Sequence, residues 1–367
     1  MTHTYADDHG WKLELGGKPD FEMAMRRIYA WYNQAMIDRP PIRFSATNAD
    51  HVIPHSTAGR NWPSLKARWF DAEYQVDYFI AGIRGRQFLA ETFPVFSPNL
   101  GPEVSAAFFG CELEYGETTS YAVANLNTWN DIDRLRFSYD NAYFRKIEEI
   151  TRLALDKCDN LFLVGYTDLH GAMDTAAAWR TPQRLCMDLL YDPERVKGML
   201  DLATAHFQEV YDHFDAMLKA RRQLSVTWMG IPSFGKMHIP SCDFAAMISP
   251  AMFAQFGLPL LREEVKPMTH NIFHLDGKGV LNHLDMILSV PEIQAIQWVQ
   301  GMGRDLPIMQ WVPLLKRIQA AGKSVVVDLQ LNELEEFIGA MKPEGVFLCL
   351  AADEDIQPEI INRVEKW

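Results

Sequence analysis

Eight short apolar runs alternate with helical patterns along this chain, and this alternation limits the folds that it can adopt. Each run has the length of a strand, is rich in apolar or β-branched residues and is bounded by Gly, Pro, Asn or Asp. The runs cover residues 42–48, 87–93, 161–168, 225–231, 271–277, 293–301, 324–330 and 345–351. Nearly continuous apolar strands that alternate with helices are typical of a parallel sheet buried on both faces. The sequence therefore predicts an α/β fold, a (β/α)8 TIM barrel, and an open doubly wound sheet is the competing fold.

The length and composition fit one large barrel domain. The chain has 367 residues, of which 48% are hydrophobic and 23% are charged, and it has no low-complexity tract. We expect a single domain over residues 1–367 with an extension at the N-terminus. Residues 101–135 show no clear helical period, and CELEYGETTSYAV within them alternates as a hairpin does. This segment is predicted to form an excursion beside the barrel mouth.

The charge and the N-terminal sequence restrict the partners and the compartment. A net charge of −13 without a run of basic residues argues against binding to nucleic acid or to an anionic membrane surface. The first residues lack the basic and apolar regions of a signal peptide, and no apolar stretch is long enough to span a membrane. Five cysteines are scattered without CxxC spacing. We expect a cytoplasmic protein that acts on a small molecule or on another protein.

Polar residues gather where the strand runs end, which is where barrel enzymes place their chemistry. They are Asn48 with Asp50 and His51; Glu91; Tyr166, Asp168 and His170; His238, Cys242 and Asp243; His274 and Asp276; Gln297 and Gln300; Asp328 and Gln330; and Cys349. Any single member is more often a helix cap or a structural histidine. Taken together they predict a polar pocket, beside which Trp228 could line an apolar wall.

The spacing of His274 and Asp276 indicates that these two residues act together. His274 and Asp276 stand two residues apart at the end of a strand run, so their side chains are expected on the same face. Two such side chains either bind a ligand together or hydrogen-bond to each other.

Several longer stretches resemble the uroporphyrinogen decarboxylase superfamily. SCDFAAMISPAMFAQFGLPLLREEV, residues 241–265, is followed nine residues later by HLDG, as a helix of the form SP..F..F..P precedes a strand in that family. LAETFPVFSPNLGPEVSAAFFGCELEYGE, residues 89–117, and GVFLCLAADEDI, residues 345–356, match it in order and spacing. The resemblance implies a (β/α)8 barrel, in agreement with the strand count. Its two main branches are the uroporphyrinogen decarboxylases and the corrinoid-protein methyltransferases, which use zinc to activate a thiol.

The methyltransferase branch is the better match. The decarboxylases carry an arginine-rich loop that grips the substrate carboxylates, whereas this chain has only RPPIRFSATNADH at that place. The methyltransferases carry a His-x-Cys-Gly motif and a distal cysteine, which correspond to His274, Asp276 and Cys349 here. Aspartate thus stands where that branch has its first cysteine.

The resemblance implies a metal held by His274, Asp276 and Cys349, with zinc as the expected ion. Because this set is harder than a His, Cys, Cys set, other divalent ions are alternatives, and His238 with Cys242 offers alternative ligands. The competing interpretation is structural: Asp276 orients His274 or caps the next helix, and Cys349 is a small buried hydrophobe.

The implied function is metal-assisted methyl transfer between a small substrate and a corrinoid protein. The expected catalytic residues are Glu91, Asp168, His170 and His238, and the expected substrate-binding residues are Asn48, Tyr166, Trp228, Gln297, Gln300, Asp328 and Gln330. The alternatives are a decarboxylase of uroporphyrinogen or a related acid, with Glu91 as its essential carboxylate, and a barrel that binds a tetrapyrrole or corrinoid without chemistry. The resemblance to the decarboxylases also implies a homodimer.

Overall fold

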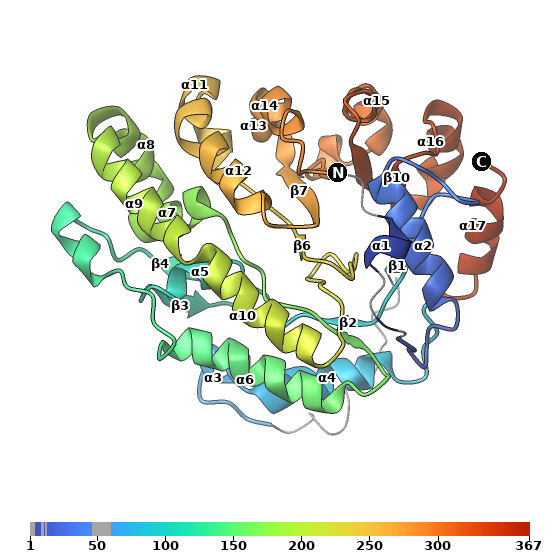
Figure 1. The fold of residues 1–367 in the computed structure, drawn as a ribbon, viewed down its shortest axis with the longest axis horizontal. Helices are drawn as coiled ribbons and strands as arrows, with labels where there is room; N and C mark the ends of the chain where they lie inside the picture. The colour runs from blue at the N-terminus through green and yellow to red at the C-terminus, as the bar shows by residue number, and fades with distance from the viewer. Residues whose placement is uncertain (1–3, 9–10, 12, 46–59) are drawn as a thin grey trace.

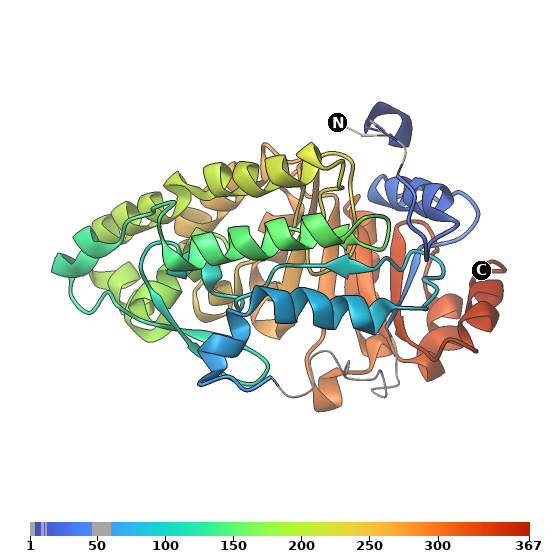
Figure 2. The same ribbon diagram turned by 90° about the horizontal axis from the view of Figure 1, so that it is seen from below.

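A computed structural model describes residues 4–8, 11, 13–45 and 60–367. Asn48 lies outside these described residues, as do Asp50 and His51. Helices surround a group of mostly parallel strands, and the strands lie side by side in the turned view (Figures 1 and 2).

Six parallel strands form one curled sheet. Their order across the sheet is β1 (Ile42–Ser45), β10 (Val346–Ala351), β9 (Ser324–Leu329), β8 (Ala295–Val299), β7 (His270–Asp276) and β6 (Met237–His238). The runs VVV in β9 and VFLCL in β10 are buried throughout, as expected for strands covered on both faces. We call this curled six-stranded sheet the half-barrel. The polar residues predicted for the site lie at the ends of its strands β7 to β10.

Two further parallel strands, β2 (Val95–Phe96) and β5 (Leu163–Val164), pair with each other outside this sheet. One backbone hydrogen bond links the chain before β2 to β1, from the N–H of Glu91 to the Ile42 carbonyl at 2.8 Å. Another links the chain after β5 to the run 225–231, from the N–H of Tyr166 to the Val226 carbonyl at 2.9 Å. The parallel strands of the described residues thus form a curled six-stranded sheet and a separate pair, and not the eight regular strands of the predicted barrel.

The difference arises where the backbone departs from the extended conformation. Ala90 has φ of +52°, which ends any strand in the predicted run 87–93. Gly230 has φ of +71°, and its N–H bonds to the Thr227 carbonyl at 2.9 Å, so the run 225–231 turns back on itself. That run keeps only an isolated antiparallel bridge between Ser225 and Ser233.

The helices begin at sites that the sequence marks. Asn141 caps α6 by accepting from the N–H groups of Tyr143 and Phe144, and Ser249 caps α11 ahead of Pro250. The helices that follow β1 are α3 (Leu65–Trp69), α4 (Ala72–Ile83), α5 (Val104–Ala107), α6 (Ala142–Lys157), α7 (Ala172–Arg180), α8 (Pro182–Tyr191), α9 (Pro193–Ala205), α10 (Phe207–Ala220), α11 (Pro250–Met252), α12 (Leu258–Val265), α13 (Gly277–Val280), α14 (Leu284–Leu288), α15 (Val312–Ala320), α16 (Leu334–Ala340) and α17 (Gln357–Val364).

Helix α2 (Phe21–Tyr32), preceded by α1 (Tyr5–Asp8), packs at the N-terminal ends of the strands. The Trp31 indole N–H lies 3.1 Å from the Gly345 carbonyl and 3.3 Å from the Val325 carbonyl. Tyr32 stacks on His270, the first residue of β7, at a ring distance of 4.0 Å. Because α2 covers this end, the polar residues at the opposite strand ends are the candidates for chemistry.

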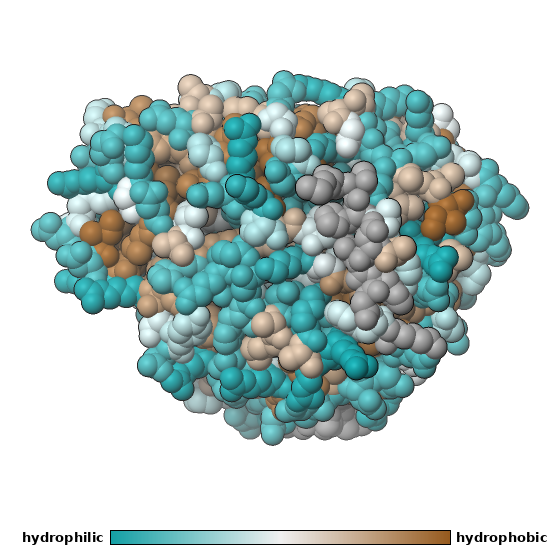
Figure 3. All heavy atoms as spheres, viewed as in Figure 1, coloured by the Kyte–Doolittle hydropathy of each residue, from teal (hydrophilic) through white to brown (hydrophobic). Residues whose placement is uncertain are grey.

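The segment 101–135 contains an antiparallel hairpin of β3 (Glu112–Tyr115) and β4 (Ser120–Val123). Within the described parts of the chain, no helix has the length and apolar character needed to cross a membrane. The face seen in Figure 3 is mostly hydrophilic, with a few hydrophobic patches.

Candidate functional site

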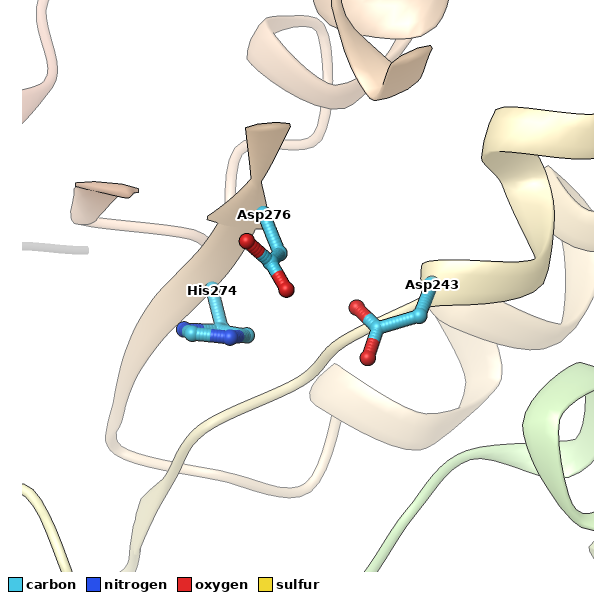
Figure 4. A group of neighbouring side chains, drawn as sticks. All are labelled: Asp243, His274 and Asp276. Carbon is cyan, nitrogen blue, oxygen red and sulfur yellow. The ribbon is translucent and has the colours of Figure 1, made fainter. Parts of the chain in front are cut away.

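Asp243, His274 and Asp276 form a cluster at the carboxyl end of β7 (Figure 4). Each offers one ligand atom, and these atoms lie within 4.8 Å of one another. His274 and Asp276 project from β7 toward the same side, as their spacing predicts. Asp243 approaches them from the short 3-10 helix η2 (Asp243–Met247).

The backbone around the cluster is fixed by neighbouring elements. Asp174 on α7 accepts hydrogen bonds from the N–H groups of Asp243 at 3.1 Å and Phe244 at 2.8 Å, which holds the start of η2. Asp276 stands at the N-cap position of α13, yet its side chain makes no capping hydrogen bond. Its carboxylate is therefore available to the cluster rather than used for helix capping.

Gln297 sets the orientation of the His274 ring. The two residues are register partners on β7 and β8, and Gln297 Oε1 lies 2.6 Å from His274 Nδ1. Only 5% of Gln297 is exposed. Because an amide oxygen only accepts, Nδ1 carries the proton and Nε2 keeps its lone pair for a ligand. A partner of this kind fixes the ring and its tautomer for metal binding.

We expect the substitution Gln297→Met, which removes the acceptor at similar size, to weaken zinc binding by about 10–100-fold. Gln297→Glu keeps an acceptor, so its affinity for zinc should stay within a few-fold of that of the wild type. Competition with a chromophoric chelator measures both. Wild-type affinity in the Gln297→Met protein, at unchanged thermal stability, would show that the hydrogen bond does not position the ligand.

Asp168, His170 and Trp228 form a second polar group beside the cluster. His170 Nε2 lies 3.3 Å from Asp168 Oδ2, and Trp228 lies close enough to the Asp168 carboxyl to help lower its pKa. The Trp228 ring also meets the His274 ring edge-on, with centroids 5.4 Å apart. Trp228 is 41% exposed, so it joins the two groups while facing solvent.

His170 is an imidazolium at neutral pH. Burial works to lower the pKa of His170, but Asp168, with help from Asp174 and Asp243, raises it to about 10. Burial likewise works to raise the pKa of Asp168, but His170 and the Trp228 N–H lower it overall. Asp168 and His170 thus form an ion pair beside the acidic cluster, in which the positive charge of His170 is balanced by Asp168.

This shift predicts how stability depends on pH. Because the pKa of His170 is raised by folding, its stabilising contribution is complete below its ordinary value of 6.5 and is lost as the pH rises toward 10. We expect wild-type unfolding free energy, measured in urea, to fall more between pH 7 and 9.5 than that of His170→Gln. The steepest slope for this single proton is about 1.4 kcal/mol for each pH unit. Parallel pH profiles for the two proteins would contradict the assignment.

Asp243 lies in a crowded acidic environment although Asp243 and Asp276 are both exposed residues. The protein atoms around its carboxyl reduce hydration, and Asp174 and Asp276 repel its charge, which together raise the pKa of Asp243 to about 6. His274 and His170 oppose this shift. Such mutual repulsion favours a cation among these side chains.

Cys349, which the resemblance made a third ligand, does not lie in the cluster, whose third member is Asp243. Cys349 is buried on β10 between its register partners Arg43 on β1 and Asp328 on β9. Burial raises the pKa of the thiol to about 11, so it is a poor thiolate donor.

Glu91, the expected catalytic acid, forms a buried structural ion pair. It is fully buried, with Oε2 2.7 Å from Arg39 Nη1 and 2.8 Å from the Ile42 N–H, and with Oε1 3.2 Å from Arg27 Nη1. These contacts tie the start of β1 to the chain before β2. Both carboxylate oxygens of Glu91 therefore make contacts that stabilise the fold.

Four other predicted site residues are also held by structural contacts. Tyr166 is buried and donates to the Met237 carbonyl at 2.9 Å, and His238 is buried with Nε2 2.8 Å from Glu264 Oε1. Gln300 donates to the carbonyls of Leu306 and Asp328, and Gln330 forms a capping box with Glu333 at η7 (Leu331–Glu333). The alternative ligands His238 and Cys242 are not part of the cluster, and both His238 ring nitrogens have protein partners, because Nδ1 also lies 3.4 Å from the Tyr166 hydroxyl.

The donor set of the cluster fits a divalent metal. One imidazole nitrogen and two carboxylate oxygens are ligand types that zinc accepts, and three protein ligands leave a position open for a substrate. Two zinc ligands at bonding distance lie about 3.4 Å apart, which is within the spread of these atoms. Without a thiolate the set is hard, so manganese, iron or cobalt would also be accepted.

Comparisons with known proteins concern the fold. The sequence matches no protein-family model and no curated protein. Among solved structures, the chain is similar to a methyltransferase from Methanosarcina mazei, with a TM-score of 0.60 and 12% sequence identity. The match covers 90% of this chain and 93% of that chain. The chain therefore has a methyltransferase-like α/β fold, while membership of the uroporphyrinogen decarboxylase superfamily and the branch within it stay predictions.

Proposed function

We propose that this protein is a metal-assisted methyltransferase that moves a methyl group between a small substrate and a corrinoid. The observation that carries the proposal is the cluster of Asp243, His274 and Asp276 at the strand ends. The likeness in fold to a methyltransferase supports it, as does the irregular half-barrel, which we interpret as a (β/α)8 barrel with shortened strands in its first half.

His274 Nε2 and the carboxylates of Asp243 and Asp276 would hold the metal, with zinc as the first candidate. A bound divalent ion acts as a Lewis acid and lowers the pKa of a thiol or hydroxyl group that it binds. Gln297 orients the imidazole, and Asp174 holds the backbone that carries Asp243.

The remaining residues shape the surroundings of the reacting group. His170 keeps its proton on Nε2 toward Asp168 and offsets part of the acidic charge. Trp228 presents an apolar surface beside His274, where a methyl group can pack without losing hydrogen bonds to water. The decarboxylase alternative loses its main support because Glu91 is already engaged by Arg39, Arg27 and the backbone.

The proposal is tested with the zinc-loaded protein, methylcobalamin and a panel of small thiols. We expect the visible spectrum of the corrinoid to change as the methyl group moves from cobalt to sulfur, and His274→Ala should abolish this change. Arg317→Gln, at an exposed ion pair with Asp285, is the matched control and should react like the wild type. A corrinoid that is bound but never demethylated would instead support the binding-protein alternative.

A further inference from the structure

His283 is a buried histidine that links the two chain segments of the candidate metal cluster. It is fully buried in the 3-10 helix η4 (Leu281–His283), which follows α13 on the segment that also carries His274 and Asp276. Its Nε2 lies 2.8 Å from the carbonyl oxygen of Ala245, in the middle of η2. Because a carbonyl oxygen only accepts, Nε2 carries a proton and donates it. A side chain of one ligand-bearing segment thus bonds to the backbone of the other.

Hydrogen bonds tie these two segments together on both sides of Asp243. Before Asp243 in the chain, the Pro240 carbonyl accepts from the N–H of His274 at 2.9 Å. After it, the Ala245 carbonyl accepts from His283. Asp243 therefore lies on a short stretch of chain that is fixed at both ends to the segment of the other two cluster residues, and its side chain points toward them (Figure 4).

The packing around η4 leaves the His283 ring little freedom to move. Gly279, on α13, lies so close to η2 that a Cβ atom there would come within 2.6 Å of the Ala246 Cβ, so only glycine allows this approach. The His283 ring packs against the ring of Phe253, with centroids 4.7 Å apart. The hydrogen bond from His283 therefore joins two segments that are in direct contact.

Stability alone does not explain a histidine at this place. The Ala245 carbonyl also accepts from the N–H of Ile248 at 3.2 Å, so it would keep a partner without His283. His283 Nδ1 is buried and has no hydrogen-bond partner among the residues that the structure describes. A buried nitrogen without a partner costs stability, and a leucine would avoid that cost. Side chains that break such a rule are commonly kept for function.

We infer that His283 is a positioning residue that holds η2 in place, so that the Asp243 carboxylate reaches the metal bound by His274 and Asp276. This inference rests on the proposed function, because it requires the cluster to bind a metal. The two carboxylates of the cluster repel each other before an ion binds. A fixed backbone keeps Asp243 beside Asp276 against this repulsion.

The test compares zinc affinity and stability in two variants of His283. His283→Leu fills similar space without a donor, so it should bind zinc about tenfold more weakly, at the lower end of the range for residues that orient a ligand. Its metal-free form should unfold at no lower urea concentration than the wild type, because the unpartnered nitrogen is gone. His283→Gln keeps an N–H donor, so its affinity for zinc should stay within a few-fold of that of the wild type. Competition with a chromophoric chelator measures the affinities.

A second comparison shows whether His283 acts through Asp243. In a protein that already carries Asp243→Asn, adding His283→Leu should weaken zinc binding by less than about twofold, because the ligand that His283 positions is already lost. His213→Leu removes a histidine from α10 and is the control, and it should bind zinc like the wild type.

The possible results separate this inference from the proposed function. Wild-type zinc affinity in His283→Leu, or a tenfold loss that persists in the Asp243→Asn background, would overturn the inference while the metal site stands. A His283→Gln protein that binds zinc as weakly as His283→Leu would do the same. If the leucine variant does not fold, His283→Asn decides, because its side chain is too short to reach the Ala245 carbonyl: a tenfold loss supports the inference and wild-type affinity overturns it. A wild-type protein that binds no divalent ion would overturn both the inference and the metal site.

Discussion

His274→Ala is expected to lower the affinity for zinc by more than about 100-fold while the protein stays folded. Removing a ligand should cost more than the 10–100-fold typical of removing a residue that hydrogen-bonds to a ligand, because the remaining carboxylates of Asp243 and Asp276 cannot complete the site. His274 is half-buried at a strand end and contacts Gln297 and Trp228, so its loss leaves the core intact. Metal content after purification without chelator and competition titration measure the effect.

Cys349→Ser provides the matched control for this prediction. Cys349 was the third ligand expected from the resemblance, whereas the structure places it beside Arg43 and outside the cluster. The serine variant should therefore bind zinc like the wild type. A steep loss of zinc in Cys349→Ser, together with retention in Asp243→Asn, would reverse the assignment of these two residues.

Glu91→Gln is expected to destabilise the protein by about 3–5 kcal/mol, the range for breaking a buried ion pair. The change would leave Arg39, which is 3% exposed, without its counter-ion, and Arg27 would lose one of its two carboxylate partners. Urea unfolding monitored by tryptophan fluorescence measures the loss.

The control for Glu91 is an exposed pair of the same kind. Asp285→Asn breaks the surface contact with Arg317 and should change the unfolding free energy by less than about 1 kcal/mol. If Glu91→Gln were as stable as the wild type but failed to turn over substrate, Glu91 would be a catalytic residue and the decarboxylase alternative would regain its support.

The second half of the fold could be predicted from the sequence. Strands β7 to β10 are long, apolar and bounded by polar residues, and the predicted runs agree with them to within a few residues. Ser249 and Pro250 marked the start of α11 through capping chemistry that acts locally. In these segments local propensity and tertiary packing favour the same structure.

The first half was harder because its strands are very short. Strand β6 has only two residues and no apolar run of its own, so no hydrophobic period marks its position in the sequence. Ala90 adopts a positive φ that alanine rarely takes, and only the packed structure holds it there. The local sequence pattern of residues 87–93 is that of a strand, so it could not show that no strand forms there.

The candidate site was predictable where it lies on one strand and not where it depends on distant elements. The spacing of His274 and Asp276 placed them on one face correctly. Asp243 reaches them through the path of the chain after β6, and Asp174 holds it from α7, which no spacing in the sequence reveals. Glu91 lies at the end of a predicted strand, but Arg39 and Arg27, which precede β1 in the chain, hydrogen-bond to its carboxylate.

X-ray absorption at the zinc edge of the wild-type protein tests the central claim most directly, because it reports the atoms around the ion. The account predicts one zinc per chain with only nitrogen and oxygen neighbours at about 2.0–2.2 Å, from His274, Asp243, Asp276 and solvent or substrate. A sulfur neighbour at about 2.3 Å in the absence of added thiol, or a protein that binds no divalent ion at all, would contradict it.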